Sequence, residues 1–153
     1  MSDLFAYYEG TLTEFLLDAI EERGRLVKIV IQYADRELVA SLAGAFPVLG
    51  ADFKHVLDNY AVRHTMMKHA SEKEESRGQV RVELDDFLML PEILAEYDAI
   101  TLTSRNGKQI IIFEKYYENY TCHLVEEIRK GRKELAVITF YKTRKGRLTG
   151  ADS

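Results

Sequence analysis

The sequence is poor in the residues that cross-link or interrupt small folds. Its 153 residues include one cysteine, Cys122, and two prolines, Pro47 and Pro91. A single cysteine excludes an internal disulfide, and nothing around it indicates a thiolate nucleophile, so a reducing compartment fits. A chain of this length buries a sizeable core without covalent support. We therefore expect one domain, in which residues 1–50 extend a core formed by residues 51–153.

Long apolar runs are also missing. No stretch approaches the roughly 20 residues that a membrane-spanning helix needs, and residues 1–10 lack the basic flank and apolar core of a secretory leader. Hydrophobic residues at 46% and aromatic residues at 10% nevertheless describe a globular chain and not a disordered one. We expect a soluble cytosolic protein, or a piece of a larger one, with no membrane partner.

Charge is unevenly distributed along the chain. The net charge of -4 by itself argues against a nucleic-acid partner. Residues 129–147, however, contain eight basic residues and one acidic residue, so this segment carries +7 and the remainder carries -11. A basic end on an acidic body is what phosphate binding requires, although a solvated lysine-rich end has the same composition. The binding interpretation is slightly favoured.

The N-terminal half is predicted to be mainly helical. Residues 11–14 have the spacing of a capping box, and a helical apolar period follows them until Gly24. Residues 26–33 are rich in β-branched side chains and predict a strand, after which Asp35 caps a helix that reaches residue 43. The next predicted segments are a loop over 44–52, a helix that begins at Asp58 or Asn59 and carries residues 61–70, a polar loop over 71–78, a short strand over 79–84 and a helix over 87–97 that Pro91 interrupts.

From residue 98 onward the hydrophobic period changes to two, which predicts consecutive strands. The pair Asn106-Gly107 is the strongest hairpin signal in the sequence. Helices followed by an antiparallel meander make an α+β domain, with room for one additional N-terminal strand. The four meander strands are predicted over residues 99–103, 109–116, 120–128 and 134–143.

Two of the four histidines, His64 and His69, lie close together with Arg63 and Lys68 beside them. Histidine exchanges protons near neutral pH and binds metals, so the pair indicates acid–base chemistry or metal ligation. Two polar residues on a surface helix are the plainer alternative. Five residues place the rings about 140° apart on a regular helix, a poor arrangement for one zinc ion. We therefore expect no metal and no other cofactor.

Cleavage of RNA without a metal makes better use of these residues. A base takes the proton of a ribose 2′-hydroxyl, an acid protonates the leaving 5′-oxygen, and cations or hydroxyls hold the phosphate charge. The last predicted strand places Thr139, Tyr141 and Thr143 on one face, an arrangement that ordinary exposed strands share. His55 and His123 are expected to be structural or surface histidines.

Between residues 52 and 145 the sequence contains a series of short blocks: Lys54 to His64 with Lys68-His69, Arg77 to Val80, Asp85-Asp86-Phe87, Leu90-Pro91, Tyr97-Asp98 and Thr139 to Lys142. In order and spacing these blocks resemble the phage branch of the barnase, EndoU, colicin and RelE-like nucleases. The resemblance implies N-terminal helices followed by a four-stranded antiparallel sheet. It also implies a metal-independent ribonuclease that leaves a cyclic phosphate, of a kind that often acts as a toxin or effector on transfer RNA.

Carried over by position, the resemblance implies that His64 and His69 are the acid–base residues and that Thr139 and Tyr141 hold the phosphate. Ala70 stands where the family commonly has a glycine. His69 is slightly favoured for contact with the scissile phosphate, because it lies at the predicted end of the helix. The candidate substrate-binding residues are the cations Arg63, Lys68, Lys142 and Arg144.

The leading hypothesis is therefore an RNA endonuclease, encoded by a phage or prophage, that acts in the bacterial cytoplasm on RNA such as transfer RNA. A non-catalytic phage module that binds RNA or a structural protein on the same fold is the second hypothesis. The third is an immunity or oligomeric interaction protein whose acidic N-terminal half masks the basic sheet. Cleavage, binding without cleavage, and the salt dependence of RNA affinity discriminate among the three.

Overall fold

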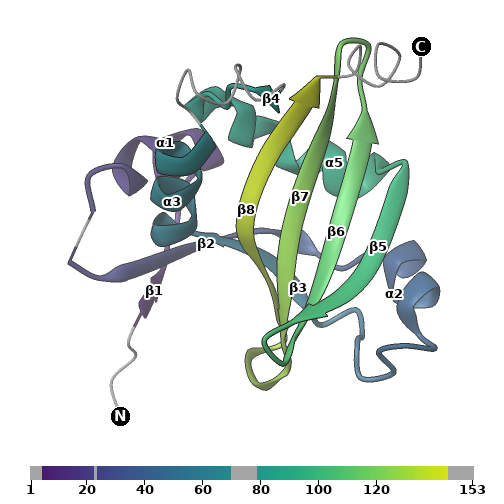
Figure 1. The fold of residues 1–153 in the computed structure, drawn as a ribbon. Helices are drawn as coiled ribbons and strands as arrows, with labels where there is room; N and C mark the ends of the chain where they lie inside the picture. The colour runs from purple at the N-terminus through teal and green to yellow at the C-terminus, as the bar shows by residue number, and fades with distance from the viewer. Residues whose placement is uncertain (1–4, 23, 70–78, 145–153) are drawn as a thin grey trace, which may run out of the picture.

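One mixed sheet organises the molecule, as the computed structural model of the chain shows (Figure 1). The structure describes residues 5–22, 24–69 and 79–144. Eight strands join in the order β1-β2-β3-β8-β7-β6-β5, and β4 pairs with β8 beside this path. The strands are β1 Phe5–Tyr7, β2 Leu26–Tyr33, β3 Lys54–Asp58, β4 Gln79–Val80, β5 Ala99–Arg105, β6 Lys108–Tyr116, β7 Tyr120–Arg129 and β8 Glu134–Arg144.

Helices pack on one face of the meander, and α3 lies along β8 on the other face, most of which no described helix covers (Figure 1). Thr139 of β8 meets Thr65 of α3, while its neighbour Phe140 packs its ring on Phe87 of η1, 5.7 Å between centroids. Because successive residues of a strand point to opposite faces, these contacts place α3 and η1 on opposite sides of β8. The helices are α1 Leu12–Ala19, α2 Arg36–Leu42, α3 Asn59–His69 and α5 Leu90–Glu96, with short 3-10 turns η1 Leu84–Met89 and η2 Lys130–Arg132.

Local sequence signals are confirmed at several element ends. Thr11 forms the predicted capping box with Glu14 at the start of α1. Asp35 caps α2 by accepting a hydrogen bond from the backbone N–H of Leu38 at 2.8 Å. Strand β2 has the predicted bounds. These elements depend on contacts within a few residues, which is why the sequence alone predicts them.

The predicted C-terminal meander is confirmed as β5 to β8. Asn106 and Gly107 both have positive φ angles, of 53° and 79°, as a two-residue hairpin turn of the right twist requires. All three pairings in the meander are antiparallel. The register pairs Glu114 with His123 and His123 with Tyr141, so side chains from three strands lie in one row.

The prediction of a four-stranded sheet is wrong in size, because the N-terminal half adds strands to the meander. Strand β3, which no sequence pattern predicted, pairs antiparallel with β2 and parallel with β8. Its sequence escapes an apolar pattern because His55 and Asp58 are buried polar residues within it. Strand β1 has only three residues, too few for a periodic signal, and pairs parallel with β2.

Two predictions between residues 79 and 97 need correction. The strand predicted over 79–84 is limited to β4, two residues long. Pro91 does not interrupt a helix but lies in the first turn of α5, where the missing N–H of proline costs no hydrogen bond. The polar loop predicted over 71–78 and the position of Ala70 lie outside the described residues.

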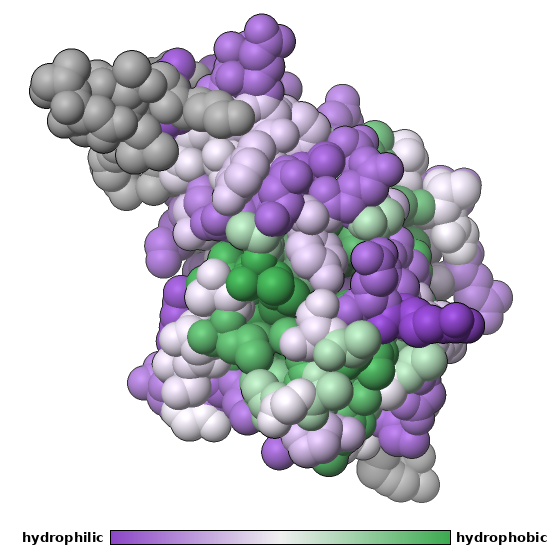
Figure 2. All heavy atoms as spheres, turned by 90° about the vertical axis from the view of Figure 1, so that its right-hand side faces the viewer, coloured by the Kyte–Doolittle hydropathy of each residue, from purple (hydrophilic) through white to green (hydrophobic). Residues whose placement is uncertain are grey.

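The edge of the sheet at β5 is partly apolar. Seen from the side that carries β5 and α2, the surface shows an apolar area with polar residues around it (Figure 2). Ile100 and Leu102 of β5 are partly buried against the core, and β6 is the strand that pairs with β5.

No helix in the described part of the chain is long and apolar enough to span a membrane.

A buried ion pair and a buried contact between a histidine and a carboxyl group bridge strands that are not neighbours. Lys28 of β2 and Glu134 of β8 lie 2.7 Å apart, with β3 between their strands. His55 of β3 and Glu126 of β7 lie 2.9 Å apart across β8. Burial alone would raise the pKa of Glu134, but hydrogen bonds from Lys28 and Tyr7 reverse this effect and hold the pKa below its ordinary value.

We expect Lys28→Met to lower the free energy of unfolding by about 3–5 kcal/mol, because it leaves the carboxylate of Glu134 buried without its cation. Adding Glu134→Gln removes that charge and is expected to recover most of the loss. Urea unfolding at pH 7 measures both changes. Lys133→Met is the matched control, since Lys133 also lies 2.7 Å from a carboxylate, that of Asp52, but with both side chains exposed. Equal stability of the two lysine variants would contradict the prediction.

Candidate active site

Helix α3 and strand β8 bring three of the four predicted catalytic residues together. The ring of His69 stacks on the ring of Tyr141, with centroids 5.5 Å apart and planes 27° from parallel. One helical turn earlier, the hydroxyl of Thr65 lies 3.4 Å from that of Thr139. Residues four apart share a helix face and residues two apart share a strand face, so the two elements make both contacts along one line.

Strand β7 adds a second imidazole, which the sequence analysis had treated as structural or surface. The ring of His123 lies 4.5 Å from that of Tyr141, and the planes are 6° from parallel. Tyr141 therefore stacks with two histidines, His69 from the helix and His123 from the neighbouring strand.

The imidazole of His123 is held at both nitrogens. Its Nδ1 lies 3.1 Å from Oε2 of Glu114 on β6, and its Nε2 lies 2.9 Å from the hydroxyl of Thr143 on β8. Burial lowers the pKa of His123, and the carboxylate of Glu114 only partly offsets that effect. The ring is thus biased toward its neutral form, in which a nitrogen can accept a proton.

The phenol of Tyr141 keeps its proton in this setting. Burial raises its pKa, the charge of Glu114 raises it further, and Arg105 lowers it to a smaller extent. A protonated phenol donates a hydrogen bond, so Tyr141 can hold an oxygen that carries negative charge.

The structure separates His64 from His69. His64 is exposed and lines a pocket away from this cluster, together with Arg105, Lys108 and residues at the end of β7 and in the first half of β8. The separation follows from the five-residue spacing on a regular helix. Of the four residues predicted to be catalytic, His69, Thr139 and Tyr141 form the cluster, and His64 lies outside it.

The four cations predicted to bind substrate differ in their exposure and in the groups that they contact. Arg63 donates hydrogen bonds to the backbone carbonyls of Glu22 and, at 3.4 Å, of Ala19, so its guanidinium ties α3 to the end of α1. Lys142 is 6% exposed, and its Nζ lies 2.8 Å from Asp86 on the sheet face opposite Tyr141. A role at the same phosphate as Tyr141 is therefore not compatible with the position of Lys142. Lys68 and Arg144 are exposed at the ends of α3 and β8.

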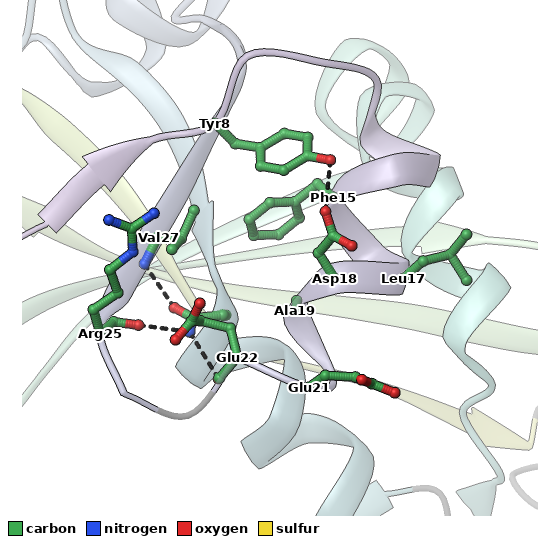
Figure 3. A pocket seen from close by; sticks show the side chains of 10 residues that line it. Tyr8, Phe15, Leu17, Asp18, Ala19, Glu21, Glu22, Arg25 and Val27 are labelled. Atoms are coloured by element: carbon green, nitrogen blue, oxygen red, sulfur yellow. Dashed lines mark hydrogen bonds between the residues drawn. The ribbon is translucent and has the colours of Figure 1, made fainter.

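A cavity of about 390 Å³ lies elsewhere, between α1 and the start of β2 (Figure 3). Tyr8 and Phe15 lie on its apolar side, and the hydroxyl of Tyr8 donates to Asp18 at 2.9 Å. Glu21 and Glu22 add acidic groups to its lining. Its acidic lining is unsuited to a phosphate. Among residues 5–22, 24–69 and 79–144, no three His, Cys, Asp or Glu side chains group as metal ligands.

The model of one protein family matches residues 32–149, which include α3, the meander and every member of the cluster around Tyr141. The family is described as phage-Barnase-EndoU-ColicinE5/D-RelE like nuclease 3. The chain belongs to this nuclease family. The match confirms the resemblance that the order of the sequence blocks indicated. No curated protein and no solved structure matches the chain.

Sequence reasoning did not place His123, Glu114 or Thr65 in the site. A signal for two of them existed in the turns. The short connections between β6 and β7 and between β7 and β8 nearly fix the register, which pairs Glu114 with His123 and His123 with Tyr141. A slip of one residue in this register would move all of these side chains to the opposite face of the sheet. Turn lengths alone do not exclude such a slip, so they indicate these residues without assigning them to the site. Thr65 gave no separate signal.

We expect Glu114→Gln to lower the pKa of His123 further, because it removes the charge that favours the imidazolium while burial persists. Histidine titration by NMR measures this pKa directly, without reference to activity. Glu118→Gln, which removes an exposed carboxylate from the turn after β6, is the control and is expected to leave the titration unchanged. A pKa of His123 that stays constant or rises in Glu114→Gln would show that the carboxylate does not act on this ring.

Proposed function

We propose that the protein is an RNA endonuclease that cleaves without a metal ion. The ribose 2′-hydroxyl attacks the adjacent phosphorus, the bond from phosphorus to the 5′-oxygen breaks, and a cyclic phosphate is left. The observation that carries this proposal is the stacking of Tyr141 with both His69 and His123. Two imidazoles beside one phenol supply a base, an acid and a hydrogen-bond donor for the phosphate in one place.

His123 is the better candidate for the base. Its lowered pKa favours the neutral ring, and Glu114 faces Nδ1, so Nε2 is the nitrogen that can take the 2′-hydroxyl proton. That hydroxyl would replace the contact between Nε2 and Thr143. A carboxylate that holds the far nitrogen of a catalytic histidine fixes the ring and stabilises the imidazolium that forms.

His69 then gives the proton to the leaving 5′-oxygen. It lies in the last turn of α3 and stacks on Tyr141 from this end of the helix. The hydroxyls of Tyr141 and Thr139 donate to the non-bridging oxygens as charge builds on phosphorus. In this scheme His64, which lines another pocket, does not act on the scissile phosphate.

Transfer RNA is the first substrate to test, in line with the sequence resemblance, and action in a bacterial cytoplasm as a phage toxin or effector belongs to the same proposal. An immunity protein or a structural phage protein is the corresponding protein partner. A binding module on the same fold would use the same cluster to hold RNA without cleaving it.

We expect His69→Ala to lower kcat for RNA cleavage by about 10²–10⁴-fold, the usual contribution of a general acid or base. Tyr141→Phe is expected to lower it by about 10²–10³-fold, because one donor to the developing charge is lost. Cleavage of a labelled transfer RNA measures both rates in the presence of EDTA, and mass spectrometry identifies the cyclic phosphate at the new end.

Two controls separate chemistry from disturbance of the fold. Met67→Ala alters an 80% exposed side chain in the same turn of α3, and Tyr33→Phe removes an exposed phenol from β2. Both are expected to cleave at the wild-type rate. Wild-type protein that leaves RNA and transfer RNA intact would overturn the proposal, and tight RNA binding without product would favour the binding module.

A further inference from the structure

A second pocket, of about 520 Å³, opens at the other end of the sheet face that carries the cluster around Tyr141. On β7, Glu127 and Arg129 continue the alternation that begins at His123. On β6, Lys108 continues the alternation that begins at Glu114. The irregularity between β7 and β8 adds its extra residue to β8 and leaves the alternation of β7 intact. The two sites therefore share one face, with Arg129 six residues, or about 20 Å, along the strand from His123.

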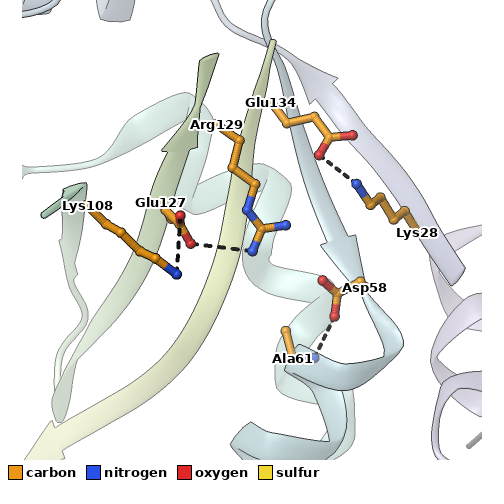
Figure 4. Close-up of polar contacts among 7 residues, drawn as sticks. All are labelled: Lys28, Asp58, Ala61, Lys108, Glu127, Arg129 and Glu134. Atoms are coloured by element: carbon orange, nitrogen blue, oxygen red, sulfur yellow. Dashed lines mark hydrogen bonds and ion pairs between the residues drawn. The ribbon is translucent and has the colours of Figure 1, made fainter. Parts of the chain in front are cut away.

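Three fixed cations line this pocket, and they outnumber its carboxylates. Figure 4 shows Arg129 and Lys108 directed toward one carboxylate, that of Glu127, from neighbouring strands, at 3.4 Å and 3.8 Å. The second carboxylate, Asp58, also lines the pocket and interacts electrostatically with Arg129, while it caps α3 by accepting a hydrogen bond from the backbone N–H of Ala61 at 2.7 Å. It is 7% exposed. Positive charge thus remains for an anion in solution.

Arg105 is the cation most available to a ligand. It lies at the exposed end of β5, and no ion pair to it occurs within the described ranges of the chain. His64 faces the same pocket from α3 and adds a positive charge whenever it is protonated. Arg105 is also close enough to Tyr141 to lower the pKa of that phenol, which links the pocket to the cluster.

We propose that the pocket formed by Arg105, Lys108, Arg129 and His64 binds a backbone phosphate that lies several nucleotides along the RNA chain from the phosphate that is cleaved. Guanidinium groups suit phosphate oxygens because they present paired N–H donors. A phosphate held there fixes the direction of the RNA across the sheet face without reading its bases. The inference rests on the proposed function, since it names how the same site would hold a longer substrate.

Substrate length gives the first test. A dinucleoside monophosphate carries one phosphate, the one cleaved, and so has none for the second pocket, whereas an octanucleotide has several. We expect Arg105→Ala and Lys108→Ala to reduce the preference of the enzyme for the octanucleotide, mainly through a higher KM and with little change in kcat. Arg36→Ala removes the same charge from the exposed start of α2 and is the control. An equal loss in Arg36→Ala, or an unchanged length preference in both pocket variants, would overturn the subsite.

Binding to uncleavable RNA gives a second test that does not depend on activity. We expect the plot of log affinity against log salt for a 2′-O-methyl octanucleotide to become shallower by about 0.7 in Arg105→Ala, the value for one lost contact to single-stranded nucleic acid. The slope of Arg36→Ala is expected to match wild type. If the slopes differ in this way but the wild-type protein never cleaves RNA, the proposed nuclease activity is wrong and the subsite is supported. Normal cleavage by the wild type, with equal salt slopes for wild type, Arg105→Ala and Arg36→Ala, would support the proposed nuclease and overturn the subsite.

Discussion

The direct passage from β3 into α3 at Asp58 and Asn59 is the constraint on which the rest of the structure depends. Asp58 ends the strand and caps the helix with a hydrogen bond of 2.7 Å. Asn59 is fully buried, accepts from the backbone N–H of Val27 and donates to two carbonyls before β2. Because β3 lies beside β8 and parallel to it, a helix that begins at this point continues along β8 in the same direction, and its last residue, His69, comes to lie over Tyr141.

The junction also explains why several ionisable side chains are buried near the middle of the sheet. Strand β3 separates β2 from β8, and Lys28 and Glu134 join these two strands across it. His55 of β3 is joined to β7 across β8 in the same way. A buried ion pair is weak evidence for stability, but a pair that must span an intervening strand is sensitive to register. We interpret these pairs as specifying where β3 inserts, and therefore where α3 begins.

The predictive power of the sequence follows the distance over which each interaction acts. The hairpin at Asn106 and the caps at Thr11 and Asp35 depend on neighbours within a few residues, and all were predictable. Strand β3 was not, because its identity depends on partners far along the chain that satisfy His55 and Asp58. The residues of the site divide in the same way, into those that local geometry indicates and those that depend on distant partners. Helical geometry alone indicated that the two histidines of α3 point apart, whereas the place of His123 required the register of three strands.

Charge counted along the sequence is a poor guide to the cations that remain available on the surface. The basic segment 129–147 carries +7, yet Lys142 and Lys133 are paired with Asp86 and Asp52, each within 3 Å. Arg105 and Lys108, which lie outside that segment, reach the pocket because the turn between β5 and β6 brings them beside Arg129. Folding therefore selects which cations remain available, and places them on the sheet face that carries Tyr141. An RNA chain bound along that face would meet fixed charge at one end and proton-transfer groups at the other, which is the order that positioning before cleavage requires.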